Sequence, residues 1–213
     1  MKPENSSTRL SFPADEPVHP WLSGLLEAYH ITDAGVCEGI RRAELQGRKL
    51  ACGKGCAACC RSHTTIPVYP LELVGISWYV TEKVSGSVRE QLRKQLLNCK
   101  GQDGCPFLVN EVCSIHPMRP MACRQFNVFD TVCSEGEDAW HTRRQDVMTP
   151  LKSYSDQAFD VMLPFYGIEK KSERRKAIRE GTIHGIARVL KDCNWASLAE
   201  KMEQHDNRKN TGD

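Results

Sequence analysis

Apolar residues recur at helical spacing along most of the chain, so the pattern predicts a protein built mainly from helices. From His19 to about Leu50 it predicts two helices, the second with Thr32 or Asp33 as its N-cap. The apolar positions that define them are Trp21, Leu22, Leu25, Leu26 and Tyr29 in the first and Ile31, Val36, Ile40 and Leu45 in the second.

Helical spacing returns after residue 68. Pro70 suits the first turn of a helix that runs to about Val84, and Glu72 is favourable near its positive N-terminal end. The further helices expected are 88–98, 151–166 with an interruption at Pro164, 172–192, and a short helix at 194–202 capped by Asn194. No strand pattern of any length competes with these helices.

Residues 51–68 and 100–136 have no usable periodicity. Loops this long are uncommon in a compact domain unless something other than hydrophobic burial orders them, and metal ligation is the obvious candidate. We therefore expect a mostly α fold in which helices frame a cysteine-rich, irregular metal-binding loop region. The expected organisation is a disordered leader at 1–16, a single helical domain at 17–203 with its metal-binding region at 51–135, and a flexible tail at 204–213.

Composition narrows the functional classes. The 213 residues are 40% hydrophobic and 26% charged, which is typical of a soluble globular chain. A formal net charge of +2 gives no argument for a nucleic-acid partner, which is not expected, and no apolar stretch approaches the roughly 20 residues of a membrane span. The first residues contain no apolar core of a secretory signal, so a cytoplasmic location is expected. Since cytosolic thiols stay reduced, the eleven cysteines indicate metal binding or redox chemistry rather than disulfides.

The first cysteine block is CGKGCAACC, which contains Cys52, Cys56, Cys59 and Cys60. A two-residue gap such as that between Cys56 and Cys59 lets a tight turn present both sulfurs to one metal. The small residues between them leave backbone amides free to donate to sulfur. The side chains of adjacent residues in extended structure point apart, so Cys60 is expected to serve a second ion or another edge of a cluster.

The second block supplies single cysteines from separate turns. It contains Cys105, Cys113, Cys123 and Cys133, with gaps of seven, nine and nine residues. The segment 119–123 predicts a proline-initiated helical turn that fixes Cys123, and Arg119 and Arg124 bring positive charge to a site whose thiolates are anionic. The two blocks together give these candidate metal ligands: Cys52, Cys56, Cys59, Cys60, Cys105, Cys113, Cys123 and Cys133.

The other cysteines, the histidines near the two blocks and the basic run at 170–176 are weaker candidates for a functional site. Cys37 and Cys193 lie within helical patterns, where core packing is the better interpretation, and Cys99 is left unassigned. His63 and His116 are interpreted as surface histidines. The basic run at 170–176 is interpreted as a solvated helix face, because no aromatic residues are interleaved with it.

The combination of CGKGCAACC with CPFL…CSIHPMRPMACRQF resembles the YkgJ-like cysteine-cluster family, the CxxCxxCC zinc- or iron-chelating domain. The motif-bearing part runs from about residue 52 to residue 133, under half of the chain. The resemblance implies metal binding, often in a protein that contains an Fe–S cluster. The same motif occurs in flagellin lysine N-methylases, so the resemblance also implies a metal-dependent protein-modifying enzyme as an alternative.

The expected function is therefore to hold an Fe–S cluster, or a zinc or iron ion, through thiolates of both blocks, with a redox role as one form of it. Thiolates suit zinc and iron alike, but sulfur-rich, histidine-poor blocks favour Fe–S. A structural zinc scaffold that binds a protein partner, a metal-dependent enzyme, and metal delivery or storage stay open as alternatives. The sequence has no GxGxxG, Walker loop or HExxH motif, so it shows no site for a methyl donor of the doubly wound kind.

Overall fold

The computed structural model describes residues 8–99 and 104–211, so the first part of the expected leader, residues 1–7, and residues 212–213 of the expected tail lie outside the described residues. The α-helices are α1 (Pro20–Leu45), α2 (Ala58–Ser62), α3 (Pro70–Glu82), α4 (Gly86–Leu97), α5 (Met121–Gln125), α6 (Ala139–Thr142), α7 (Lys152–Met162), α8 (Lys171–Glu180) and α9 (Trp195–Thr211). The strands are β1 (Pro67–Val68), β2 (Leu108–Val109), β3 (Val112–Cys113) and β4 (Arg188–Val189). The expected mostly α fold is confirmed.

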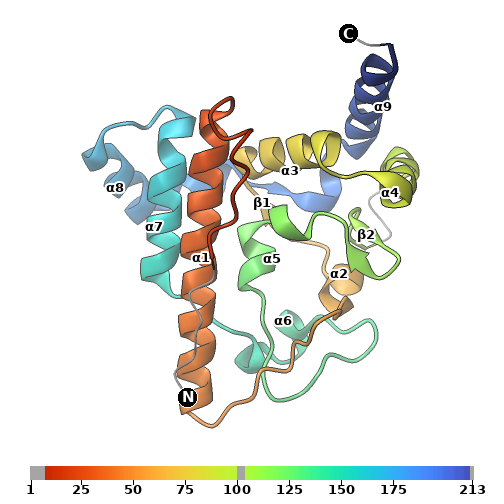
Figure 1. Ribbon diagram of the computed structural model, residues 1–213. Helices are drawn as coiled ribbons and strands as arrows, with labels where there is room; N and C mark the ends of the chain where they lie inside the picture. Colours follow the sequence, from red (N-terminus) through yellow and green to blue (C-terminus); the bar gives the residue numbers. More distant parts are fainter. Residues whose placement is uncertain (1–7, 100–103, 212–213) are drawn as a thin grey trace.

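The sheet is confined to two antiparallel pairs, β1 with β4 and β2 with β3. Short 3₁₀ turns connect several elements: His116–Met118, Arg144–Asp146, Leu163–Tyr166, Thr182–Ile186 and Leu190–Asp192. Figure 1 shows α1 running beside α7, with α2, α5, α6 and the long loops between them on the opposite side of α1 from α7. Helices therefore frame the cysteine-rich region, which lies at one end of the molecule.

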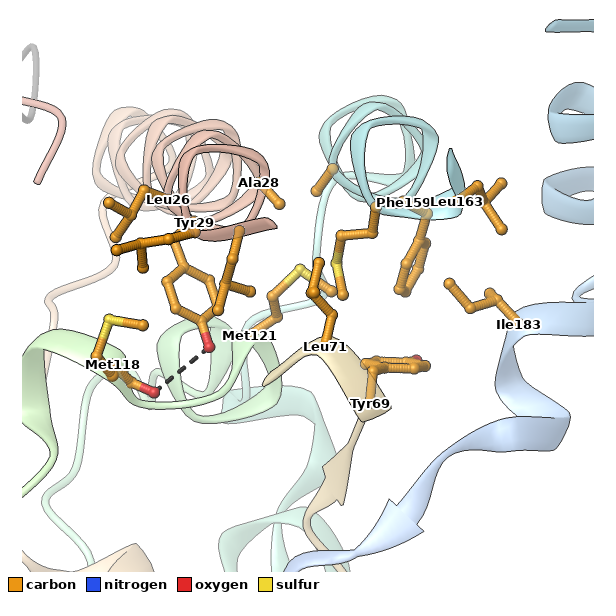
Figure 2. Close-up of a cluster of buried hydrophobic side chains, with 14 of the residues drawn as sticks. Leu26, Ala28, Tyr29, Tyr69, Leu71, Met118, Met121, Phe159, Leu163 and Ile183 are labelled. Atoms are coloured by element: carbon orange, nitrogen blue, oxygen red, sulfur yellow. Dashed lines mark hydrogen bonds between the residues drawn. The ribbon is translucent and has the colours of Figure 1, made fainter. Parts of the chain in front are cut away.

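The first core cluster joins α1, α3, α5 and α7 (Figure 2). Leu26 and Tyr29 of α1 pack with Met121 of α5 and Phe159 of α7 in this cluster. The Tyr29 hydroxyl donates a hydrogen bond to the carbonyl of Met118 at 3.4 Å. Because Met118 directly precedes the segment that leads into α5, this contact ties the second cysteine block to the helical frame.

A second core cluster lies between α3, α4, α9 and the β2–β3 hairpin. Phe107, which directly precedes β2, is fully buried and meets the Trp195 ring of α9 edge-on, with 4.7 Å between centroids. Leu92 and Leu96 of α4 are fully buried in the same cluster. Ordinary hydrophobic packing therefore contributes to holding the hairpin of the second cysteine block on α4 and α9.

The prediction of two helices between residues 19 and 50 is wrong, because α1 is continuous from Pro20 to Leu45. Thr32, expected to cap a second helix, is buried and donates its hydroxyl to the carbonyl of Ala28 at 2.8 Å, a bond that a threonine inside a helix makes to the preceding turn. Asp33 instead pairs with Arg124 of α5 at 2.7 Å. Thr32 and Asp33, which indicated a helix start, therefore both find polar partners without any break in α1.

The C-terminal third also differs from the pattern. The helix expected at 172–192 ends at Glu180, since Gly181 adopts a left-handed φ of +67° and closes α8. Beyond it the chain forms a 3₁₀ turn and β4. Asn194 caps α9 as expected, because its side-chain oxygen accepts from the Ser197 amide at 3.2 Å, but the helix continues to Thr211.

Two segments expected to be flexible pack on the fold. In the expected tail, Asp206 of α9 pairs with Arg89 of α4 at 2.8 Å. In the described part of the expected leader, the Phe12 ring lies 4.9 Å from the ring of Trp78 in edge-on geometry. Arg9 pairs with Glu16 at 2.8 Å. Tertiary contacts of this kind give no periodic signal in a short sequence window.

Candidate metal centre

The two cysteine blocks meet through their backbones at α2. Helix α2 carries Cys59 and Cys60, and the Cys105 amide donates to the Cys60 carbonyl at 2.7 Å. Gly104 has a φ of +67°, and a Cβ at this position would lie 2.9 Å from the same carbonyl oxygen. Glycine accommodates both the left-handed backbone and the close approach. Gly104 therefore lets the second block dock against the first.

The β2–β3 hairpin positions Cys113. Asn110 and Glu111 form its turn with φ of +49° and +63°, the left-handed pair that a two-residue hairpin turn requires. In the resulting register Cys113 lies opposite Leu108. The hairpin therefore returns the chain toward Cys105, eight residues earlier in the sequence.

Helix α5 positions Cys123. Two buried charged residues hold this helix in place: Glu72 of α3 and Arg124 of α5 itself. Glu72, fully buried at the start of α3, accepts from the Tyr69 amide at 2.9 Å and from the Met121 amide at 2.7 Å. Arg124 donates to the carbonyls of Arg119 and Pro117, pairs with Asp33, and lies 4.0 Å from the Tyr29 ring centre. Burial raises the pKa of Glu72 to about 7, despite the two amide donors and Arg124. These contacts confirm the proline-initiated turn that the sequence predicts before Cys123.

Five thiols, which we call the inner thiols, converge from α2, the hairpin and α5: Cys59, Cys60, Cys105, Cys113 and Cys123. The neighbouring Cys105 thiol is the largest cause of the raised pKa of Cys60, which reaches about 12, and burial adds to it. The adjacent Cys60 thiol is the largest cause of the strongly raised pKa of Cys59, and burial adds to it.

Burial is the largest cause of the raised pKa of Cys113 and of Cys123. Around Cys123, negative charge on Cys59, Cys60 and Cys113 would add to that rise. The inner thiols therefore oppose one another's ionisation, and a bound cation would relieve this repulsion.

We call the remaining three candidates the outer thiols: Cys52, Cys56 and Cys133. The Val128 amide donates to the Cys52 sulfur at 3.2 Å, and Arg143 donates to the Cys133 sulfur at 3.6 Å. Cys52 and Cys133 pack against one small hydrophobic cluster, whereas Cys56 is exposed. Burial raises the pKa of both Cys52 and Cys133, and negative charge on Cys56 would raise each further.

A cavity of about 820 Å³ opens beside α2 and α5. All five inner thiols line it, and so does Cys56, while Cys52 and Cys133 belong to the cluster next to it. The structure thus gathers on the wall of one cavity cysteines that are up to 67 residues apart in the sequence, Cys56 and Cys123. This arrangement is the main feature that the spacing of the two blocks suggested.

The thiols share a wall but do not already surround one point. Within residues 8–99 and 104–211, no three His, Cys, Asp or Glu side chains stand in an arrangement that could hold an ion. The donors nevertheless match zinc and iron, since both bind thiolates. Amide and guanidinium groups that donate to sulfur, as at Cys52 and Cys133, are the usual neighbours of metal-bound thiolates. The residues therefore fit a thiolate-held metal in their chemistry, and closing around it requires side chains to turn toward one another.

One polar group of the cavity escaped the sequence analysis. His63, interpreted as a surface histidine, has a side chain only 11% exposed and lies 3.2 Å from Asp138, with its ring edge-on to Phe126. Burial lowers its pKa. Its position three residues after Cys60, one helical turn along, was the available signal. His116 is exposed, as expected, and also lines the cavity.

The cysteines outside the two blocks lie elsewhere. Cys37 is a partly buried residue of α1. Cys193, expected within a helix, follows a 3₁₀ turn and donates to the Val189 carbonyl at 3.5 Å. Cys99 and Cys193 pack against the second core cluster. None of these three lines the cavity described above.

In a comparison with protein families, residues 51–147 match the model described as "CxxCxxCC: Putative zinc- or iron-chelating domain". The match begins one residue before Cys52 and ends beyond Cys133, so it contains all eight candidate ligands. Neither the curated proteins nor the solved structures contain a match. Across the described residues, every helix is too short or too polar to cross a membrane.

Proposed function

We propose that the protein holds an iron–sulfur cluster through its inner thiols, a proposal supported by the match of residues 51–147 to a zinc- or iron-chelating domain. The observation that carries the proposal is the convergence of five thiols from both blocks on one cavity wall. Clusters of two or four irons take four cysteine ligands, and the inner group offers five. Each inner ligand is a sulfur, which favours iron–sulfur chemistry over the oxygen-rich sites of hard cations.

The chain's own residues do three things for such a centre. Gly104 lets the backbones of the two blocks touch, Glu72 and Arg124 fix the helix that bears Cys123, and Arg119 lies among the thiols as a positive charge. Negative charge on Cys59 or Cys113 would be stabilised by Arg119. When bound, an iron–sulfur cluster supplies one-electron transfer.

Metal binding also contributes to folding in this proposal. The inner thiols join α2, a two-residue-strand hairpin and a five-residue helix, none of which is stable alone at such a length. Free energy from thiolate ligation would therefore hold these short elements together. We expect loss of the metal to loosen the second block before it affects α1 and α7.

A structural zinc site is the second candidate, favoured by the two-residue gap between Cys56 and Cys59. It predicts a colourless protein with stoichiometric zinc, whereas the cluster predicts a brown protein. Four thiolates would close such a site, so a zinc-loaded protein would be a scaffold and not a redox protein.

Serine variants of single cysteines test the assignment. Cys59→Ser and Cys123→Ser are expected to lose most of the bound metal, whereas Cys37→Ser, a matched change on α1 away from the cavity, is expected to keep it. Cys133→Ser tests the outer thiols in the same way. Metal content is measured on protein purified without oxygen. Equal metal in the wild type, Cys59→Ser and Cys123→Ser would contradict the ligand assignment.

A further inference from the structure

The cavity beside the inner thiols offers more room than a metal centre occupies. Its volume of about 820 Å³ lies in the range of about 300–1,000 Å³ that is usual for small-molecule sites. Beyond the thiols, much of the wall is apolar, with Ile66, Phe126, Trp140 and Met148 among the lining residues. A wall of this composition suits an organic molecule with an apolar body.

The acidic groups of this cavity are already matched by neighbouring donors. Asp138 accepts from the Trp140 amide at 3.0 Å and faces the His63 ring at 3.2 Å. Glu111 forms an ion pair with Arg61. Both carboxylates on the cavity wall are therefore already engaged by groups of the protein itself.

Arg119 is in the opposite situation. It lines the cavity, and within the described part of the chain its buried Nε has no hydrogen-bond partner and its guanidinium forms no ion pair. Arg124, five residues later, shows the contrast, since it uses its guanidinium on two backbone carbonyls and on Asp33. A buried donor without a partner costs free energy, and a guanidinium is suited to paired hydrogen bonds with a carboxylate.

We propose that this cavity binds a small organic carboxylate, with its acid group on Arg119 and its apolar body against Phe126 and Trp140. The positive charge of Arg119, together with the exposed Lys54 on the rim, sets the sign of the ligand. The apolar wall sets the character of the rest of the molecule. The groups that would contact this ligand line the same cavity as the inner thiols, but none of them is a candidate metal ligand, so the inference does not require the iron–sulfur assignment.

The alternative role for Arg119 is to neutralise the negative charge of metal-bound thiolates and nothing else. In that case removal of the Arg119 charge would change the metal content, and the affinity for an organic anion would not depend on Arg119. The two roles therefore differ in what the same variant changes.

The probes are benzoate and benzamide, which share one shape and differ in charge. Binding to the full chain as purified is measured by titration calorimetry, with metal content determined for every sample. Wild type is expected to bind one benzoate per chain, at least about tenfold more tightly than benzamide, the size of effect of one charge-assisted hydrogen bond. Arg119→Gln is expected to remove this preference when its samples are compared with wild-type samples of the same metal content. Arg175→Gln, an exposed change on α8, is expected to leave it intact.

Three results would overturn the proposal: no saturable binding of benzoate, equal binding of benzoate and benzamide, or a preference for benzoate that survives in Arg119→Gln. A loss of the preference that is seen only in samples of Arg119→Gln that have also lost their metal would overturn it too, because Arg119 would then act through the metal centre. A protein without iron or zinc that still prefers benzoate would contradict the proposed function and leave this inference standing.

Discussion

The buried carboxyl group of Glu72 gives a sharp test of how α5 is held beside the inner thiols. Its pKa is raised from the usual 4.5 to about 7, chiefly by burial. Between these two pH values the folded state binds more protons at this group than the unfolded state does, so the contribution of Glu72 to stability falls as pH rises. The difference of about 2.5 pH units, at about 1.4 kcal/mol for each, corresponds to about 3 kcal/mol.

The perturbation is Glu72→Gln, which keeps the shape of the side chain and does not titrate. The free energy of unfolding is measured by urea denaturation of both proteins at several pH values from 4 to 8. The stability of the wild type relative to the variant is expected to fall by about 3 kcal/mol over this range, and pH effects common to both proteins cancel. Glu90→Gln, an exposed change on α4, serves as the control. A difference that stays constant with pH, or that grows as pH rises, would refute the account of Glu72.

Two glycine substitutions test close approaches in the structure. Gly104→Ala would place a Cβ 2.9 Å from the Cys60 carbonyl oxygen on a left-handed backbone, so we expect about 1–3 kcal/mol of destabilisation and reduced metal content. The matched control is Gly53→Ala, because Gly53 has open space around it. Equal metal content in the two variants would contradict the role of Gly104 in docking the two blocks. Gly75→Ala would place a Cβ 2.3 Å from Leu25 in the core, so thermal unfolding is expected to show a loss of about 1–3 kcal/mol. An unchanged melting temperature would show that α1 and α3 can separate without cost.

The sequence predicts the helical frame well because hydrophobic spacing acts within one helix. The helices at Pro70 and near Leu151 begin close to where the pattern places them. The division of α1 is wrong for a local reason: a threonine can cap a helix or bond to the preceding turn, and only the packing of Thr32 shows which. Asp33 was ambiguous in the same way, because its partner Arg124 is 91 residues away.

The candidate site depends more on contacts between distant segments. The two cysteine blocks and the turn before Cys123 could be identified from spacing and from Pro120. The separation into inner and outer thiols could not, because it follows from the docking of Cys105 on Cys60. His63 reaches the cavity wall through Asp138, 75 residues later. Spacing therefore identifies ligand types, whereas tertiary packing decides which of them meet.

The central claim is that the inner thiols hold an iron–sulfur cluster, and the most direct measurement is the iron and acid-labile sulfide content per chain. The protein is purified without oxygen, and its visible spectrum is recorded on the same sample. The account predicts a brown protein with broad visible absorbance and matching amounts of iron and sulfide. Stoichiometric zinc without iron or sulfide, in a colourless protein, would contradict it.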